Sequence, residues 1–582
     1  MIGDVVIDPL PKPKLLAVSP EVADLVGLDR SLLSSDNFLQ FFSGNMDAMT
    51  SSETGERFQS WATPYALSLY GEEMYRNCPF QNGNGYGDGR AVTIAEVLTP
   101  DTGRWELQLK GSGTTPFCRG GDGRAVLRSS LREFLASEAM HHLGVSTTRG
   151  LSLIVSEEET VHRPWFTAQK TQIYDTDPRI AHLPTEVRRA IVQEVNSQPD
   201  AMIEEYTANT CRVAPSFVRV GHIELFARRY RKALEGTDEA ERRFRRVELR
   251  LIMEHLLFRE FNGPEPTPAD QPDAPDLQSR ILLGLRESSN RIALLTAEWM
   301  RVGYCQGNFN SDNCLAGGRT MDFGPFGFIE RYESNWNMWS GGGDKYSFRN
   351  QHMAGERNFF SLASSAALLL DAAGQEELTT SIIPGHMVRA TRAVEDVYRQ
   401  KMGLLEWSTR AAQVFDRLDQ VMEAAALDYT IFWRQLADIV ETSLIAAGGE
   451  EEGYSRNISS DLLSALSTAF YKDPTPELTA QLTETLEQWL SLVLDEVNAR
   501  PGSTHTPASI AQRMRLVSPK YVPREWMLVG AYTAASKGDY DPLHTLQRLF
   551  EKPYDEQPEM AASFYKKTPA DVMGKAGVAT MT

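Results

Sequence analysis

The spacing of hydrophobic and polar residues predicts a strand, a helix and a second strand in the first third of the chain. Residues 104–110 alternate in polarity and predict a strand that ends at Lys110. Over residues 125–143 the apolar side chains recur at helical spacing, and Gly144 is placed to terminate the helix. Residues 151–155 form a short apolar run, which predicts a buried strand.

The rest of the chain is mainly helical in its pattern. Polar, irregular sequence at 156–208 predicts an insertion, and five prolines between positions 263 and 276 predict a surface loop. This order predicts an α+β fold with a small mixed α/β lobe, a larger helical lobe and a helical extension. The expected units are an N-terminal extension at 1–57, the small lobe at 58–210, the larger lobe at 211–370 and the helical C-terminal extension at 371–582.

Composition narrows the class of protein further. Hydrophobic residues make up 42% and charged residues 24% of the 582 positions, which is ordinary for a globular protein. No apolar run reaches the ~18 residues of a membrane span, and residues 1–15 lack the apolar segment of a signal peptide. We therefore expect a soluble intracellular protein with no visible targeting segment.

Charge and cysteine usage exclude further classes. The net charge of −19 argues against a nucleic-acid binder, because binding to phosphates along a nucleic acid needs a basic face. The five cysteines include no Cys-x-x-Cys pair, which indicates a reducing compartment without a disulfide framework or structural zinc site.

A short motif, Gly-Asp-Gly-Arg-Ala-Val, occurs twice, at 87–92 and at 121–126. Consecutive backbone N–H groups in glycine turns can bind an anion, and the second copy opens the predicted helix, whose N-terminus favours phosphate. Two tight turns with exposed arginines are the alternative. Because the two copies flank the strand that ends at Lys110, phosphate binding is the favoured interpretation.

Two further groups of residues have the chemistry of a nucleotide site. Lys110 at a strand end and Glu133 on the next helix resemble the lysine–glutamate pair of protein kinases, although a surface lysine is the alternative. Residues 310–313, Asn-Ser-Asp-Asn, and 322–324, Asp-Phe-Gly, supply the oxygen ligands that Mg²⁺ prefers; two Asx turns are the alternative. Arg212 and Arg219 could bind phosphate as bidentate forks, but from their sequence context alone surface arginines are the favoured interpretation.

Several longer motifs resemble the selenoprotein O family. They include Leu-Gln-Leu-Lys-Gly, which contains Lys110, and Asp-Phe-Gly-Pro-Phe-Gly-Phe, which begins at Asp322. The matching segments are 107–116, 121–130, 132–135, 212–214, 312–313, 322–328, 519–521, 538–540 and 553–558. They are spread over most of the chain, and the resemblance implies a cytoplasmic location or, in a eukaryote, a mitochondrial one.

The resemblance implies a protein-kinase-like bilobal fold, often called a pseudokinase, that binds ATP in a flipped orientation. It implies AMP transfer from ATP to protein hydroxyl groups, with Mg²⁺, or alternatively Mn²⁺, as the metal. By position, the residues expected to bind ATP are Gly87, Gly89, Arg90, Lys110, Asp122, Gly123, Arg212, Arg219 and Asp322. Asp312 would be the general base, Asn313 and Asp322 would hold the metal, and Glu133 would pair with Lys110.

The chain departs from the family pattern at two places that bear on function. Gln306 stands where many members have a histidine, close to the expected base. No cysteine follows Cys314. The redox regulation proposed for members with a C-terminal cysteine or selenocysteine pair would therefore lack its C-terminal residues in this chain.

Three functions follow as hypotheses. The first is a protein AMPylase acting on Ser, Thr or Tyr hydroxyls, with ATP and protein substrates as partners and without nucleic acid or membrane. The others are a conventional protein kinase and a non-catalytic ATP-binding scaffold. In the first, a locally basic pocket in an acidic body would hold the ATP phosphates, and its residues would be Arg90, Lys110, Arg124, Arg212 and Arg219.

Overall fold

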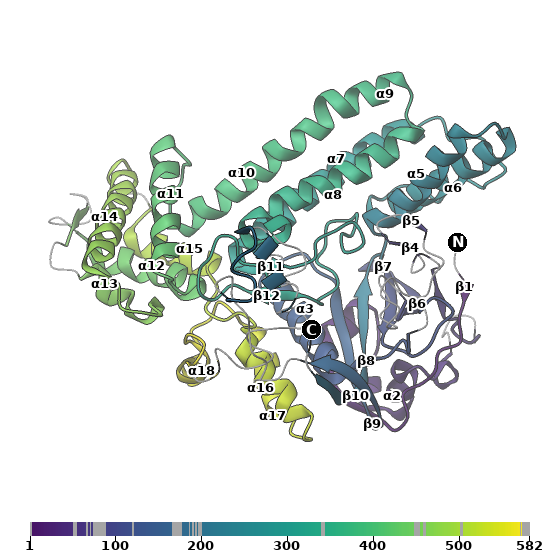
Figure 1. The fold of residues 1–582 in the computed structure, drawn as a ribbon, viewed down its shortest axis with the longest axis horizontal. Helices are drawn as coiled ribbons and strands as arrows, with labels where there is room; N and C mark the ends of the chain where they lie inside the picture. The colour runs from purple at the N-terminus through teal and green to yellow at the C-terminus, as the bar shows by residue number, and fades with distance from the viewer. Residues whose placement is uncertain are drawn as a thin grey trace.

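The computed structural model contains a large antiparallel sheet and many helices, so the expected mixture of α and β structure is confirmed (Figure 1). It describes residues 3–50, 55–63, 65, 68–69, 72–73, 89–118, 121–165, 177–185, 187–188, 191–192, 195, 199, 201–338, 344–446, 454–457, 461–500, 504–570 and 572.

The main sheet has the strand order β1-β3-β6-β7-β10-β9-β2, and β8 pairs with β10 outside this path. Its strands are β1 (Gly3–Asp4), β2 (Pro13–Val18), β3 (Trp61–Ala62), β6 (Ala91–Thr99), β7 (Gly103–Lys110), β8 (Ala125–Val126), β9 (Arg149–Trp165) and β10 (Ala201–Ala214). Among the described residues, three two-stranded antiparallel sheets lie apart from it: β4 (Ser68–Leu69) with β5 (Glu72–Glu73), β11 (Tyr304–Gln306) with β12 (Phe326–Phe328), and β13 (Leu444–Ala446) with β14 (Tyr454–Arg456).

The predicted strand that ends at Lys110 is confirmed as β7, in the centre of the sheet. Its last residue lies between Ala91 of β6 and Thr210 of β10. Because a strand pairs with this end of β7 on each side, the backbone of Lys110 has a fixed position in the middle of the sheet.

The predicted helix is α3 (Leu127–His142), which packs against β9 and β10 with almost every side chain buried. It starts two residues later than expected, because Ala125 and Val126 pair with β10 as β8. Its end is as predicted, with Gly144 at φ +78°. The left-handed backbone there is one that glycine adopts without steric cost.

Residues 156–208 were expected to be an irregular insertion, but both ends of this segment belong to strands of the main sheet. β9 continues to Trp165 and β10 begins at Ala201, and the two strands pair throughout this arm. The arm was missed because residues 157–165 and 201–206 are all intermediate or exposed, so its sequence lacks the apolar positions of a buried face. Most of residues 166–200 lies outside the described residues; among the positions that are described there, 185, 187–188, 191–192 and 195 are helical.

The helices of the middle of the chain are long and lie side by side (Figure 1). They are α5 (Val220–Glu235), α6 (Glu239–Glu260), α7 (Leu277–Val302), α8 (Gln351–Ala366), α9 (Ala372–Glu377) and α10 (Ile383–Lys401). The proline-rich stretch forms the expected loop between α6 and α7. Gly303 caps the end of α7, and its φ of +80° lies in the left-handed region that glycine adopts without steric cost.

The C-terminal extension is helical, as predicted, and divides into two groups. The first group packs around a separate hydrophobic core and contains α11 (Thr409–Ala424), α12 (Tyr429–Ser443), α13 (Leu462–Ala465), α14 (Pro476–Asn498) and α15 (Pro507–Val517). The second group contains α16 (Glu525–Ala535), α17 (Asp541–Phe550) and α18 (Pro558–Phe564); α16 and α17 return to pack on α3. Two short helices, α1 (Pro20–Leu25) and α2 (Asp36–Ser43), lie in the chain between β2 and β3.

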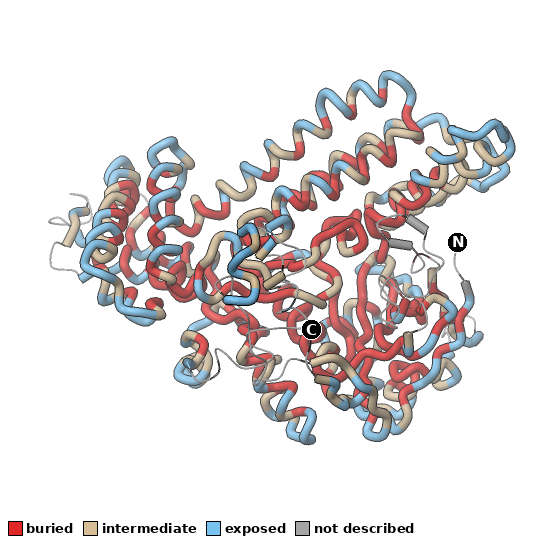
Figure 2. The backbone as a smooth tube through the Cα atoms, viewed as in Figure 1, coloured by how far each residue is buried: buried red, intermediate tan, exposed pale blue. Residues whose placement is uncertain are grey.

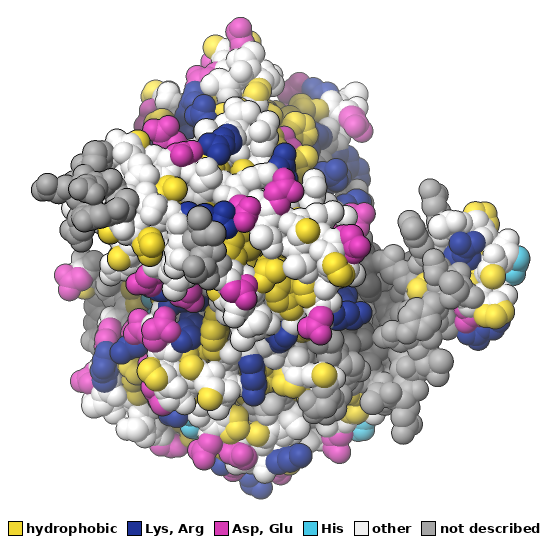
Figure 3. All heavy atoms as spheres, turned by 90° about the vertical axis from the view of Figure 1, so that its left-hand side faces the viewer, with side chains coloured by type: hydrophobic (Ala, Val, Ile, Leu, Met, Phe, Trp, Pro, Cys, Tyr) yellow, Lys and Arg dark blue, Asp and Glu magenta, His cyan; other side chains and the backbone are white. Residues whose placement is uncertain are grey.

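Burial is continuous from the sheet through α3 into the middle helices (Figure 2). The face shown in Figure 3 has acidic and basic side chains intermixed, with hydrophobic side chains scattered between them. Among the helices in the described parts of the chain, none combines the length and apolar composition that a membrane span requires.

Candidate functional site

Lys110, Glu133 and Asp322 meet under the centre of the sheet. The Lys110 Nζ atom donates to Glu133 Oε2 at 2.5 Å and to Asp322 Oδ1 at 2.7 Å. The expected Lys110–Glu133 contact is therefore present, and the alternative of a surface lysine is wrong, because Lys110 is only 8% exposed. One cation links the strand β7, the helix α3 and the loop before β12.

Asp322 is placed by an unusual backbone conformation, with φ at +61°. Burial raises the pKa of its carboxyl group, but Lys110, Arg212 and Arg219 outweigh this effect and hold the pKa well below the usual value. The carboxylate is therefore ionised at neutral pH and is a good oxygen ligand for a divalent cation.

Gln306, at the end of β11, supports the backbone around Asp322. Its Nε2 atom donates to the carbonyl oxygen of Asp322 at 3.1 Å and to that of Met321 at 3.3 Å. The hydroxyl group of Tyr304 donates to Gln306 Oε1, and the backbone N–H of Gln306 donates to Gln351 Oε1 at 2.9 Å. Gln306 is thus a fully bonded support of the loop.

Asp312 lies in the same connection between β11 and β12 and is 5% exposed. Its N–H donates to Asn310 Oδ1 at 2.9 Å, so an Asx turn is present and fixes the loop. The hydroxyl group of Tyr65 donates to Asp312 Oδ1. The carboxylate therefore accepts a hydrogen bond from a hydroxyl group in the same way that a general base would.

Tyr65 and His222 are residues of this site that sequence reasoning missed. The two rings stack with centroids 4.0 Å apart. Burial, and next the charge of Arg219, hold the pKa of His222 well below its usual value, and its Nδ1 accepts from the N–H of Arg219 at 3.0 Å. Gly221 makes room for them, because a Cβ atom there would lie 1.9 Å from the Tyr65 hydroxyl. No local motif marks Tyr65, which is 247 positions from Asp312.

Asn313 follows the proposed base directly. Its Nδ2 atom donates to the carbonyl oxygen of Asn308 at 2.9 Å. The amide oxygen is consequently the atom that Asn313 can offer to a cation. An ionised carboxylate at Asp322 and an amide oxygen at Asn313 fit the oxygen ligands that Mg²⁺ or Mn²⁺ takes alongside water and phosphate.

Arg212 and Arg219 are buried beside this group, each 3% exposed, so the interpretation as surface arginines is wrong. Arg212 Nη1 lies 3.5 Å from Glu133 Oε1, and its Nη2 donates to Gln108 Oε1 across the β7–β10 pair. Arg219 precedes α5 and pairs with Leu315 in an isolated bridge. Two guanidinium groups in a buried position favour an anionic ligand.

The second glycine turn is part of the segment between β7 and α3, and the described residues of the first turn form hydrogen bonds with this segment. Gly87 lies outside the described residues, whereas Gly89 is buried and its carbonyl oxygen accepts from Thr115 Oγ1 at 3.0 Å. Arg90 is exposed, and its carbonyl oxygen accepts from the N–H of Gly111 at 2.7 Å. Gly123 has φ +66° and must be glycine, because a Cβ atom would lie 1.9 Å from the carbonyl oxygen of Gly113.

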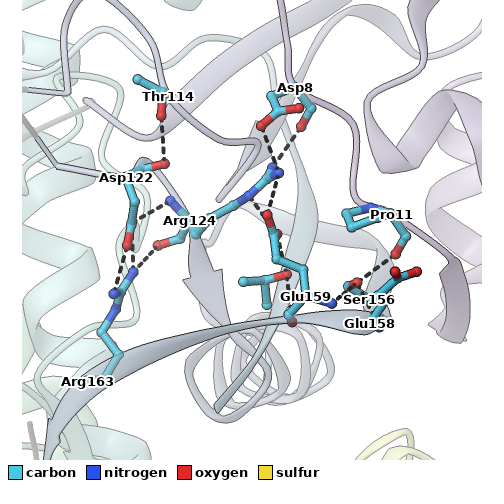
Figure 4. A network of polar contacts seen from close by, with 10 residues as sticks. Asp8, Pro11, Thr114, Asp122, Arg124, Ser156, Glu158, Glu159 and Arg163 are labelled. Atoms are coloured by element: carbon cyan, nitrogen blue, oxygen red, sulfur yellow. Dashed lines mark hydrogen bonds and ion pairs between the residues drawn. The ribbon is translucent and has the colours of Figure 1, made fainter. Parts of the chain in front are cut away.

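Asp122 and Arg124 form ion pairs with other parts of the protein (Figure 4). Arg163 donates to both carboxylate oxygens of Asp122, at 2.7 and 2.9 Å. Burial raises the pKa of Asp122, but Arg163 outweighs it, so the pKa is below its usual value. Arg124 pairs with Asp8 at 3.0 Å and with Glu159 at 2.8 Å. The expectation that Arg124 belongs to the basic phosphate pocket is therefore corrected: these two carboxylates already balance its charge.

A cleft of about 600 Å³ lies between the sheet and helices α5 and α6. Its walls include Thr93 and Gln108 from the sheet and Phe226 from α5, and it also contacts Tyr65 and His222. Since Gln108 bonds Arg212 and Tyr65 bonds Asp312, the cleft opens directly beside the charged group. Its apolar walls suit the face of an aromatic base.

Cys305 and Cys314, which flank the proposed base in sequence, are both buried. Burial raises the pKa of each thiol well above its usual value, so the reactive thiolate form is disfavoured.

Comparisons with known proteins identify the class. The model of the family described as protein adenylyltransferase SelO matches residues 2–170 and 197–551. The protein nucleotidyltransferase YdiU of Azoarcus sp. (strain BH72) is 33% identical over 563 residues, covering 95% of this chain and 88% of the relative. That of Rhodopirellula baltica is 32% identical over 553 residues, with 94% and 88% covered. That of Xanthomonas campestris pv. campestris is 32% identical over 578 residues, with 99% and 92% covered.

These matches and the site define a nucleotidyltransferase. More particularly, the chain belongs to the protein adenylyltransferase SelO family, as its motifs indicated.

Proposed function

We propose that the protein transfers AMP from ATP to Ser, Thr or Tyr hydroxyl groups of other proteins, with Mg²⁺ as cofactor and pyrophosphate as the product released. The proposal includes a kinase-like bilobal arrangement, with the main sheet and α3 as one lobe and the middle helices as the other. The observation that carries it is the contact of Lys110 with both Glu133 and Asp322, beside a carboxylate, Asp312, that accepts a hydroxyl hydrogen bond.

The roles of the residues follow from the charges that change during transfer. Asp312 would take the proton of the attacking hydroxyl group while the oxygen of that hydroxyl group forms a bond to the α-phosphorus. The bond from the α-phosphorus to the bridging oxygen of pyrophosphate breaks, and that oxygen carries the developing negative charge. Lys110, Arg212 and Arg219 would stabilise this charge, because they are buried cations fixed before the reaction.

Asn313 and Asp322 would hold the metal through one amide oxygen and one carboxylate. The ion would supply further neutralisation of the phosphate oxygens. Gly87, Gly89, Arg90, Asp122 and Gly123 remain proposed ATP contacts, with the difference that Asp122 would act together with Arg163, its partner in the structure.

Transfer from ATP labelled at the α-phosphate distinguishes the three hypotheses. We expect label from α-labelled ATP, and none from γ-labelled ATP, to appear on added protein substrates in the presence of Mg²⁺. Label passed only from the γ-phosphate would indicate a kinase instead. Stabilisation of the protein by ATP without transfer of either label would indicate a scaffold. A reaction with EDTA serves as the metal-free control and should show no transfer.

Replacement of Gln306 should reduce activity through the loop that it supports. Gln306→Ala removes the donor to the Asp322 and Met321 carbonyl groups, and loss of such an outer contact to a metal ligand typically costs roughly 10- to 100-fold. We expect Gln306→His to retain more activity than Gln306→Ala, because an imidazole N–H can still donate one of these bonds. Titration of transfer rate against Mg²⁺ measures the effect; equal curves for wild type and Gln306→Ala would contradict it.

A further inference from the structure

The helix α16 of the C-terminal extension reaches the site through one buried ion pair. Glu525, its first residue, accepts from Arg132 Nη2 at 2.9 Å, and the two side chains are 8% and 4% exposed. Arg132 directly precedes Glu133 on α3. A residue 393 positions further along the chain is thus in contact with the neighbour of the glutamate that binds Lys110.

Arg132 also contacts the loop that carries the proposed metal ligand. Its Nη2 atom donates to the carbonyl oxygen of Phe326 at 3.3 Å, and its guanidinium lies 4.6 Å from the centre of the Phe326 ring. Phe326 begins β12, shortly after Asp322. The same side chain therefore joins α3, the metal loop and the extension.

Arg524, the residue before Glu525, contacts the segment that follows β12. It donates to Asp428 at 2.7 and 2.8 Å and to Glu330 at 3.1 Å, and Glu330 follows β12 closely. Two consecutive residues of the extension therefore contact both α3 and the segment after the metal loop. Both contacts are buried, so solvent screening is weak.

The packing of the extension on α3 supports the same role. Both α16 and α17 pack against α3. On α17, His544 forms a hydrogen bond with the carbonyl oxygen of Leu16 at 2.8 Å, and Gln547 Nε2 donates to that of Val18 at 3.1 Å. The extension is consequently attached to the sheet as well as to the helix, and α3 is held from both sides.

Glu525 is charged under ordinary conditions despite its burial. Burial raises the pKa of its carboxyl group to about 6, while Arg132 and Arg128 act in the opposite direction and Glu330 adds to the increase. At neutral pH the carboxylate is therefore ionised. Removing it would take the negative charge of Glu525 away from the buried Arg132 guanidinium, and breaking a buried ion pair in this way is strongly destabilising.

We propose that the Arg132–Glu525 pair is a positioning device, through which the C-terminal extension fixes α3 so that Glu133 holds Lys110 against the nucleotide phosphates. This inference rests on the proposed function, because it assigns to Lys110 the phosphate-binding role given above. Neither residue of the pair touches the substrates; they act through Glu133 and the metal loop.

The test uses the full chain with Glu525→Gln, Arg132→Met and the double variant. Glu525→Asp serves as the conservative variant and Glu559→Gln, at an exposed position on α18, as the matched control. We expect kcat for AMP transfer per folded molecule to fall roughly 10- to 100-fold in each single variant, since small displacements of positioning groups have effects of this size. The KM for ATP should change less than kcat. The double variant should be no worse than either single one, because the pair acts as a unit.

Hydrogen–deuterium exchange over residues 127–142 provides a readout that does not depend on AMP transfer. Faster exchange in Glu525→Gln, together with the loss of kcat and partial recovery in Glu525→Asp, would support the proposal. A lower melting temperature with unchanged kcat per folded molecule would overturn it and leave the pair a purely structural one. If wild type itself transfers no α-label, the proposed function fails; exchange over α3 in the variants would still report whether the extension fixes this helix.

Discussion

Replacing Asp322 with asparagine should nearly abolish AMP transfer. The substitution removes the negative charge that would bind the metal and one of the two carboxylates on Lys110. A catalytic metal contributes several kcal/mol of stabilisation to the transition state. Since ~1.4 kcal/mol corresponds to tenfold in rate, a loss of roughly 100- to 1,000-fold is expected. The rate of α-label transfer at saturating ATP measures it.

The matched control for this variant is Asp101→Asn, in the exposed turn between β6 and β7. It has the same chemical change at a position away from the site and should transfer AMP at the wild-type rate. Excess Mg²⁺ or Mn²⁺ should restore part of the activity of Asp322→Asn, because the remaining ligands bind the ion more weakly. Wild-type activity in Asp322→Asn at low Mg²⁺ would remove Asp322 from the metal site.

Replacing Asp312 with asparagine should lower kcat while leaving ATP binding in place. A positioned general base contributes roughly 100- to 10,000-fold to rate, and an amide cannot accept the proton of the attacking hydroxyl group. Asparagine has nearly the same shape and can still accept the hydrogen bond from Tyr65, so the fold should be retained. Single-turnover transfer of α-label, with ATP affinity measured in parallel, separates the two effects.

The two variants are expected to differ in a diagnostic way. Asp322→Asn should change the dependence on metal concentration, whereas Asp312→Asn should keep that dependence and lose rate at every concentration. If Asp312→Asn instead retained full kcat with weaker ATP binding, Asp312 would be a ligand of the nucleotide or metal and the base would have to be sought elsewhere.

Short-range patterns were sufficient for the elements that carry the site. The alternation before Lys110 predicted β7, and the helical spacing of apolar residues predicted α3 with its end at Gly144. β7 is buried over its last five residues and α3 over almost its whole length, and the apolar residues of each recur at the spacing of a strand or a helix. The outer arm of β9 and β10 lacks a buried face, and its strands could not be recognised from sequence.

The partners of charged residues could not be predicted in the same way. Arg124 belongs to a glycine-rich motif and looked like a phosphate ligand, yet Asp8 and Glu159 bind it. Arg212 was interpreted from its sequence context as a surface residue, and only the pairing of β10 with β7 shows that it is buried beside Gln108. A charged side chain has no periodic signature of its own, and its environment depends on which strands pair.

By itself, the sequence determined the family, the central strand and helix, and the types of residue that the chemistry requires. The tertiary structure decided which of these residues meet. Lys110 and Asp322 are 212 positions apart, and Arg132 and Glu525 are 393 apart. Contacts over such separations come from strand pairing and helix packing across the whole core, and no local pattern of residues records them.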